Sequence, residues 1–229
     1  MNAREIVAKL KSLANPENIE GMARFGINPK NTLGVSVPEM RKLAKQAGKN
    51  HALAQELWKT GIHEARIVAG LVDEPAKVTE KQMDAWAKDF DSWDVCDQVC
   101  MNLFDKTPFA YKKATEWSAA NEEFVKRAGF ALMASLAVHD KTASDQKFTA
   151  FFEAVKRGAT DDRNFVKKAV NWALRQIGKR NKRLNADAIK TAKEIQKLDS
   201  KAAKWIAADA IKELESNAVR LKTSRTRFE

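Results

Sequence analysis

Apolar side chains recur at intervals of three and four residues along nearly the whole chain, which is the spacing of one buried helical face. Residues 36–39 (SVPE) place Ser at a helix cap, Pro in the first turn and Glu three residues after the Ser. Pro16, Pro29 and Pro75 interrupt the pattern and mark breaks between helices. The pattern predicts helices over residues 3–14, 17–25, 37–48, 50–60, 63–73, 79–90, 93–105, 108–119, 121–138, 144–157, 161–180, 186–198 and 201–215.

The composition also favours an all-α protein. The 229 residues include only 9 Gly and 5 Pro, too few for a fold built of many strands and turns. The length is enough to bury a substantial core, and no stretch rich in Gly, Ser or Pro divides the chain. We therefore expect a single domain over residues 1–218. Residues 219–229 are basic and lack helical periodicity, which predicts a mobile tail that adds nonspecific affinity for phosphates.

A short sequence repeat indicates how the helices stack. Residues 124–128 (FVKRA) recur as residues 165–169 (FVKKA), and each copy opens a long helix preceded by a shorter one. Weaker echoes occur at residues 63–68 and 203–208. A chance match remains an alternative, but recurring helix pairs predict an α-solenoid of stacked antiparallel hairpins at the spacing of HEAT-type repeats. Equivalent helices would then lie side by side, with Lys126, Arg127, Lys167 and Lys168 on one basic concave face.

The positive charge of the chain is concentrated in its second half. The formal net charge is +11, of which residues 121–229 contribute +10. No acidic residue lies between Arg163 and Ala186, whereas eight basic residues do. Because an ordinary solvated surface mixes its signs, this stretch indicates an anionic partner. Nucleic acid is the partner that we favour; an anionic membrane and the absence of any specific partner are the alternatives.

Cysteine usage and hydropathy place the protein in a reducing, aqueous compartment. Cys96 and Cys100 are four residues apart on one predicted helix, a spacing that is poor for a disulfide, so we expect two small core residues. The chain begins with no signal peptide and contains no apolar run of the roughly 20 residues that span a membrane. We expect a cytoplasmic protein without membrane association.

Residues 91–97 (DSWDVCD) carry the strongest chemical signal. A helix capped by Ser92 or Asp91 places Trp93 and Asp97 on the same face. An indole beside a carboxylate suits a flat, cationic substrate, and a basic chain indicates that this substrate lies on a polyanion. Chemistry on modified DNA bases follows as the hypothesis. Trp93 could instead be a core anchor and Asp97 a structural ion pair, and a metal site that includes Asp94 lacks further ligands.

Trp172 lies at the centre of the basic stretch. Lys168 and Arg175 flank it along its own helical face. An aromatic ring within a phosphate-binding strip is typical of a contact to a sugar or a base. The alternative is that Trp172 anchors the core of a repeat.

Four blocks in order carry a resemblance to a known family: residues 22–25 (MARF), 33–43 (LGVSVPEMRKL), 92–97 (SWDVCD) and 165–175 (FVKKAVNWALR). Across roughly residues 5–215 the chain resembles the HEAT-like-repeat alkylpurine DNA glycosylases, the AlkD-type DNA alkylation repair family. The resemblance implies that Trp93, Asp97 and Trp172 form the catalytic set and that Arg127 binds a phosphate. The chain departs from the family at Phe25, where members carry Tyr, and at Ser92, where members often carry a second aromatic residue.

The resemblance implies a monofunctional DNA glycosylase that releases cationic N3- or N7-alkylated purines, such as 3-methyladenine and 7-methylguanine, from duplex DNA. Asp97 would stabilise the sugar oxocarbenium and orient a water, while Trp93 and Trp172 pack on the deoxyribose backbone. The resemblance also implies that the lesion stays stacked in the duplex. The expected phosphate-binding residues are Arg127, Lys126, Lys167, Lys168, Arg175, Lys179, Arg24 and Arg41.

No metal or organic cofactor is expected, and no lysine suggests lyase activity. The expected partner is double-stranded DNA that contains alkylated purines; we expect a monomer without an obligate protein partner. A noncatalytic HEAT-like protein that binds distorted or branched DNA is the main alternative, because it needs the same basic residues. A protein-interaction scaffold is a further alternative; a steep loss of DNA affinity with added salt would argue against it, and a flat response would favour it.

Overall fold

The structure is a computed structural model that describes residues 1–225, apart from the side chains of residues 222, 224 and 225. All regular secondary structure within this range is helical, so the predicted all-α class is confirmed. The chain groups into two compact units, Met1–Thr107 and Pro108–Glu229, which are described in turn. The single domain expected over residues 1–218 stays a prediction.

The first unit is built around helix α5. Its elements are α1 (Ala3–Ser12), α2 (Pro16–Arg24), α3 (Val37–Ala47), α4 (His51–Lys59), α5 (His63–Val72), η1 (Pro75–Lys77), α6 (Glu80–Lys88), α7 (Trp93–Asn102) and η2 (Phe104–Lys106). Helix α5 packs against α3, α4 and α7. Helices α1, α2, α4 and α6 begin where an Asn or Thr side chain accepts a hydrogen bond from a free backbone N–H group.

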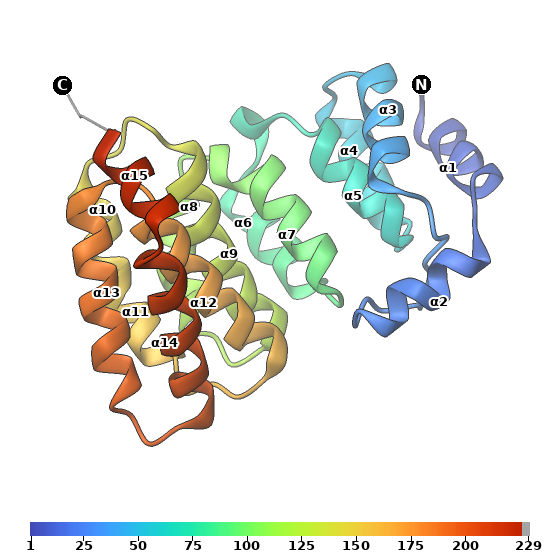
Figure 1. Cartoon of the computed structure of the whole chain (residues 1–229). Coiled ribbons are helices and arrows are strands. Elements are labelled where there is room, and N and C mark those ends of the chain that lie inside the picture. The colour runs from blue at the N-terminus through green and yellow to red at the C-terminus, as the bar shows by residue number, and fades with distance from the viewer. Residues whose placement is uncertain (226–229) are drawn as a thin grey trace. The chain divides into compact units, whose positions relative to one another are not determined.

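The second unit consists of stacked helix pairs. Its elements are α8 (Ala110–Ser118), α9 (Glu123–His139), α10 (Asp145–Thr149), α11 (Phe151–Gly158), α12 (Asn164–Gly178), α13 (Lys182–Gln196), α14 (Lys201–Leu214) and α15 (Asn217–Arg225). Helices α8, α11 and α13 form one layer, and α9, α12 and α14 form the other; α15 packs on α13 and α14 (Figure 1). This is the repeat packing that the sequence predicts.

Three of the contacts between successive helix pairs of the second unit join residues that are 38 apart. Arg127 on α9 donates to the carbonyl of Phe165 on α12 over 2.6 Å. Asn171 on α12 donates to Asp209 on α14 over 2.6 Å, again 38 residues away. In the other layer, Lys156 on α11 and Glu194 on α13 are 3.4 Å apart at the same offset. These three contacts tie one helix pair to the next at the same spacing, which supports a repeat.

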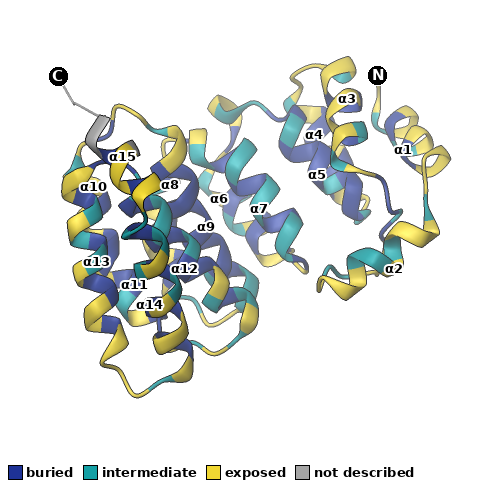
Figure 2. Cartoon of the chain, viewed as in Figure 1, coloured by how far each residue is buried: buried dark blue, intermediate teal, exposed yellow. Residues whose placement is uncertain are grey.

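Two helices of the second layer, α9 and α12, are buried along more than half of their length. In α9 every residue from Arg127 to Ala137 is buried, and α12 is nearly as enclosed (Figure 2). Gly129 allows α9 to approach α8 closely, because a Cβ atom there would lie 2.4 Å from the backbone N of Ser118. Close packing fixes the orientation of α9 and α12, on which most of the predicted DNA-binding residues lie.

The helices depart from the sequence prediction at three places. Residues 144–157 form two helices, α10 and α11, rather than one. Helix α13 begins at Lys182 and not at residue 186, because the side chain of Asn181 caps it by accepting from the N–H of Leu184. The predicted lack of helical structure from residue 219 is wrong as far as Arg225, because α15 buries Val219 and Thr223. The rest of the predicted mobile tail, residues 226–229, lies outside the described residues.

Candidate active site and nucleic-acid interface

The first turns of α7 hold Trp93 and Asp97. Ser92 is the N-cap residue, with an extended backbone, so the helix begins where the sequence predicts. Val95, Cys96, Val99 and Cys100 face the core, whereas Trp93 and Asp97 are partly exposed. The indole Nε1 of Trp93 donates to the carbonyl of Phe25 over 3.2 Å. The carboxylate of Asp97 is therefore not enclosed in the apolar interior, and the adjacent indole is held by a fixed contact.

A buried polar network supports the start of α7. The Nε2 atom of His63 lies 2.8 Å from Asp94, and Ser92 donates to the same carboxylate over 2.6 Å. The Ser92 hydroxyl in turn accepts from the backbone N–H of Asn28 over 3.3 Å. His63 is 4% exposed and Ser92 is fully buried. The network joins α5, α7 and the loop after α2, the loop that begins with the indole's partner Phe25.

The two ionisable partners in this network shift each other's titration. Burial disfavours the charged form of His63, but the hydrogen bond to Asp94 and its negative charge outweigh burial and raise the pKa of the imidazole. Burial likewise acts to raise the pKa of Asp94, yet the hydrogen bond and charge of His63 prevail and lower it. The pair is therefore stabilised in its ionised form.

Glu64 fixes the loop before α3 from inside the first unit. Its side chain is fully buried and accepts hydrogen bonds from the backbone N–H groups of Leu33, Gly34 and Val35 over 2.8–3.2 Å. Gly34 has φ +76°, and a Cβ atom there would lie 2.1 Å from the carbonyl oxygen of Asn15. The block of residues 33–43 that supports the family resemblance thus contains a backbone turn that depends on Gly34 and Glu64.

Several predicted phosphate-binding residues of the second unit pair with carboxylates. Lys126 lies 3.0 Å from Asp161, and the hydrogen bond from Arg163, with a further contribution from Lys126, lowers the pKa of Asp161 to about 2. Arg175 and Lys179 both contact Glu213, over 2.5 and 2.7 Å. Asp161, in the loop before α12, and Glu213, on α14, thus neutralise part of the positive charge of this unit.

Arg127 and Arg180 are largely internal. Arg127 is 6% exposed, and its observed hydrogen bond to Phe165 ties α9 to α12. Arg180 is 8% exposed and donates to the carbonyls of Ala137, Asp140 and Ala143. Both guanidinium groups therefore join helices, whatever else they contact.

The accessible cations of this unit include Lys167 and Lys168 in the first turns of α12. Lys168 is exposed, and the Nζ atom of Lys167 lies 5.1 Å from the ring centre of Trp205, itself 42% exposed. Trp172 lies one turn further along α12 and is partly exposed, whereas its neighbours Asn171 and Ala173 are buried. Within the second unit, the structure brings these aromatic and basic groups onto α12 and the adjoining α14.

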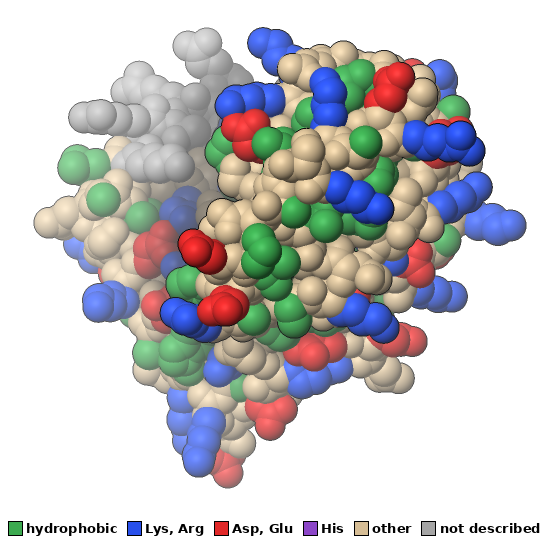
Figure 3. Space-filling model, turned by 90° about the vertical axis from the view of Figure 1, so that its right-hand side faces the viewer, with side chains coloured by type: hydrophobic (Ala, Val, Ile, Leu, Met, Phe, Trp, Pro, Cys, Tyr) green, Lys and Arg blue, Asp and Glu red, His purple; other side chains and the backbone are tan. Residues whose placement is uncertain are grey.

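Two predicted DNA-binding residues lie in the first unit. Arg24 ends α2 and is exposed, with Glu20 3.9 Å away. Arg41 is exposed on α3, where it lines a small cavity of about 280 Å³ together with Lys45 and Lys49. Figure 3 shows one face of the molecule, on which basic side chains stand among acidic and apolar ones. No strongly single-signed surface is visible on that face.

Sequence reasoning missed the polar groups that hold the candidate residues in place. These are His63, Glu64 and the carboxylates of Asp161, Asp209 and Glu213. Asp209 and Glu213 are four residues apart, as are their partners Asn171 and Arg175, so the two acidic residues share one face of α14 and their partners share one face of α12. Phe25 is 78% exposed next to Trp93, which marks it as an accessible aromatic residue at the site.

Comparison with protein families identifies the class. A family model described as "DNA alkylation repair enzyme" matches residues 6–214. The match covers most of the chain, which therefore belongs to this DNA alkylation repair family. A search of curated protein sequences finds no match.

One solved structure shows the same fold. It belongs to "a new family of proteins related to the HEAT-like repeat DNA glycosylases with affinity for branched DNA structures"; it is 23% identical, covers 93% of this chain and 95% of that chain, and has a TM-score of 0.77. An engineered protein (14% identity, 77% and 90% of the two chains, TM-score 0.39) and a designed armadillo repeat protein (15%, 77% and 92%, TM-score 0.37) are much less similar. The chain is a HEAT-like-repeat protein.

The described residues can also be considered for membrane spanning and for metal binding. No helix in this part of the chain is both long and apolar enough to cross a membrane. Over the same range, no cluster of three or more His, Cys, Asp or Glu side chains is arranged to hold a metal ion.

Proposed function

We propose that the protein is a monofunctional DNA glycosylase that releases cationic N3- or N7-alkylated purines from duplex DNA. The observation that carries this proposal is the start of α7, where Asp97 remains accessible next to an indole fixed by Phe25. Membership of the DNA alkylation repair family supports it. The protein acts as a cytoplasmic monomer and needs neither a cofactor nor a protein partner.

The proposed reaction makes use of the charge of the lesion. Alkylation at N3 or N7 makes the purine a formal cation, so the glycosidic bond breaks with both electrons leaving on the base. The Asp97 carboxylate stabilises the positive charge that develops on the sugar and orients the water that adds to C1′. Trp93 and Trp172 pack on the deoxyribose backbone and exclude bulk water, which strengthens the electrostatic interaction.

Phosphate binding is assigned to the basic residues of both units. On α12, Lys168 is exposed and the neighbouring Lys167 is partly exposed. Lys126, Arg175 and Lys179 would exchange a carboxylate partner for a phosphate, and Arg127 would contribute while it remains bonded to Phe165. Arg24 and Arg41 would add contacts from the first unit.

A second candidate is a noncatalytic protein that binds distorted or branched DNA. The fold neighbour with a TM-score of 0.77 belongs to a family with affinity for branched DNA structures, which favours this alternative. Both candidates use the same cations and differ in what Asp97 does. A protein-interaction scaffold would need neither set of residues.

Base release separates the two candidates. Purified protein is incubated with duplex DNA that contains 7-methylguanine, and the free base is quantified. We expect release by the wild type, a loss of at least about 100-fold in Asp97→Asn, and wild-type release by the control Asp199→Asn, whose carboxylate is exposed. Binding without release by the wild type, or undiminished release by Asp97→Asn, contradicts the proposal.

The assignment of phosphate-binding residues is tested by measuring the DNA affinity of variants on duplexes of different sequence. Lys168→Gln should weaken the binding of all duplex sequences alike, because phosphate contacts carry no sequence information. The same expectation holds for Arg127→Ala, but that change also removes a bond between α9 and α12 and lowers stability. A loss confined to some sequences would mean that the side chain reads bases.

A further inference from the structure

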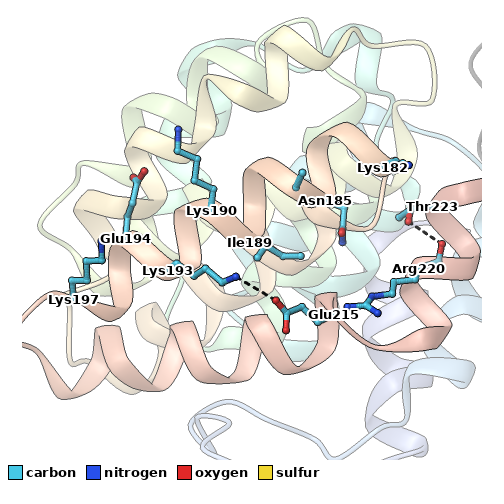
Figure 4. Close-up of a pocket in the computed structure, with 11 residues that line it drawn as sticks. Lys182, Asn185, Ile189, Lys190, Lys193, Glu194, Lys197, Glu215, Arg220 and Thr223 are labelled. Atoms are coloured by element: carbon cyan, nitrogen blue, oxygen red, sulfur yellow. Dashed lines mark hydrogen bonds and ion pairs between the residues drawn. The ribbon is translucent and has the colours of Figure 1, made fainter.

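A groove of about 800 Å³ runs along the outer helix α13 of the second unit. Lysines of α13 line one side, and Glu215, Arg220 and Thr223 close the other side from the end of α14 and from α15 (Figure 4). Five of the lining side chains are basic and two are acidic. The groove has no part in the proposed glycosylase reaction.

The lysines of this groove form a row. Lys182, Lys190, Lys193 and Lys197 all line it, and their spacing in multiples of three and four residues keeps them on one face of α13. With a rise of about 1.5 Å per residue, the row extends for about 22 Å. One DNA strand carries a phosphate about every 3.4 Å of helix axis, so a row of this length can follow several phosphates.

Both acidic residues of the groove already have basic partners. Glu215 lies 3.5 Å from Lys193, and Figure 4 shows these two side chains pointing toward each other across the groove. Glu194 lies 3.4 Å from Lys156 of α11. Within the described part of the chain, Lys182, Lys190 and Lys197 have no ion-pair partner. These three lysines give the groove its unbalanced positive charge.

Helix α13, which carries the lysines of the groove, lies in a different layer of the second unit from the DNA-binding candidates on α9 and α12. Helix α13 belongs to the layer of α8 and α11, whereas Lys126, Lys167 and Lys168 lie on α9 and α12. Duplex DNA is stiff, with a persistence length of about 150 base pairs, so one straight duplex does not fold around a helix layer to reach both surfaces. Two DNA arms that diverge from a junction can contact both surfaces at once.

We propose that the α13 groove binds the phosphate backbone of a second DNA arm while another arm contacts the layer of α9 and α12. The inference rests on the DNA binding in the proposed function and not on base release. A protein with both surfaces prefers branched DNA to a linear duplex of the same sequence.

Charge removal in the groove tests the proposal. The triple variant Lys182→Gln/Lys190→Gln/Lys197→Gln is compared with Lys9→Gln/Lys11→Gln/Lys81→Gln, which removes three exposed lysines from α1 and α6. Binding to a four-way junction and to a matched linear duplex is titrated over a series of salt concentrations. Circular dichroism and thermal unfolding verify that both variants fold.

The groove variant should bind the junction about 10- to 100-fold more weakly, with a salt slope reduced by about three units. Its binding of the linear duplex should change by less than about 2-fold, and its release of 7-methylguanine from that duplex should equal that of the wild type. The control variant should match the wild type on both substrates.

An equal loss on the junction and the linear duplex, or no loss on the junction, overturns the proposal. Loss of binding to phosphatidylserine vesicles with unchanged junction binding also overturns it, because the groove would then bind a membrane. If Asp97→Asn leaves base release intact while the groove result is as expected, the glycosylase proposal fails and the second DNA surface stands.

Discussion

The two units use buried charge in opposite ways. In the first unit, buried carboxylates capture backbone N–H groups: Glu64 binds three of them, and the fully buried Asp73 accepts from the backbone N–H of Glu74. In the second unit, buried guanidinium groups capture carbonyls, as Arg127 and Arg180 do. Part of the positive charge of the second half therefore lies inside the protein. A net charge counted from sequence overstates what this unit presents to DNA.

The buried charges of the two units also support different parts of the proposed function. Those of the first unit support the residues proposed for catalysis, and those of the second unit support the residues proposed for DNA binding. The carboxylates of the first unit order the loop and the helix start that carry Phe25 and Trp93. The cations of the second unit hold helices in register, and the remaining ones at the surface are partly neutralised by Asp161 and Glu213. Four experiments test this contrast.

The largest expected loss of stability comes from replacing Arg180, an internal cation of the second unit. Arg180→Met leaves three carbonyls without their donor and should lower the free energy of unfolding by about 3–5 kcal/mol. Urea unfolding measures this loss. DNA affinity of the folded variant should stay near that of the wild type, because the guanidinium is internal. A stable variant that no longer binds DNA would show that Arg180 belongs to the binding surface and would remove the contrast.

A slightly smaller effect is expected at the internal carboxylate of the first unit. Glu64→Gln replaces one of the two accepting oxygens with a donor that faces backbone N–H groups, so the free energy of unfolding should fall by about 2–4 kcal/mol. Base release should fall with it, since the loop that carries Phe25 loses its support. Glu17→Gln on α2 is a matched control with an exposed side chain and should cost less than about 0.5 kcal/mol. Equal stability of the two variants would mean that Glu64 does not fix the loop.

The pair of His63 and Asp94 should make stability depend on pH. The pKa of His63 is raised above 6.5, so its contribution is complete below that pH and is lost as pH rises through the folded-state value. The pKa of Asp94 is lowered below 3.8, so its contribution is present above that pH and is lost as pH falls through the folded-state value. The pair therefore stabilises the fold most between these two limits.

Unfolding of His63→Gln across this pH range measures the pair's contribution. The variant should lose about 1–3 kcal/mol at pH 5–6, where the buried pair is ionised, and the difference from the wild type should shrink at alkaline pH. A pH-independent difference would mean that His63 acts through packing alone.

The smallest expected effect is a gain in DNA binding in the second unit. Glu213→Gln frees Arg175 and Lys179 from their shared carboxylate, so DNA affinity should rise about 3-fold and the salt slope should steepen by about one unit. Stability should fall by less than about 1 kcal/mol, because the three side chains are partly exposed. Unchanged or weaker DNA binding would exclude Arg175 and Lys179 from the interface.

The sequence predicted most helices because their apolar faces recur with a regular period. The predicted start of α13 is wrong because Asn181, which caps the helix, lies among basic residues without a periodic pattern of apolar positions. The helix through Val219 and Thr223 was missed because its apolar face has few members. Local periodicity thus predicted the helices where a wide apolar face exists.

The candidate residues were predictable only in part. Trp93 and Asp97 stand four residues apart, so their common side of α7 follows from helix geometry. The partners His63 and Glu64 lie some thirty residues from the groups that they bind, a relation that no local pattern contains. No local pattern predicts the burial of Arg127 either, because its hydrogen-bond partner Phe165 lies 38 residues away in the first turn of α12.

The spacing of 38 residues that three contacts between successive helix pairs share has an evolutionary consequence. The middle pair, α11 and α12, accepts from α9 through the carbonyl of Phe165 and donates to α14 through Asn171, so a duplicate of this pair would supply both halves of a new joint. Such an array can gain or lose whole copies without inventing an interface. The reach of proteins built this way can therefore change during evolution in steps of one helix pair.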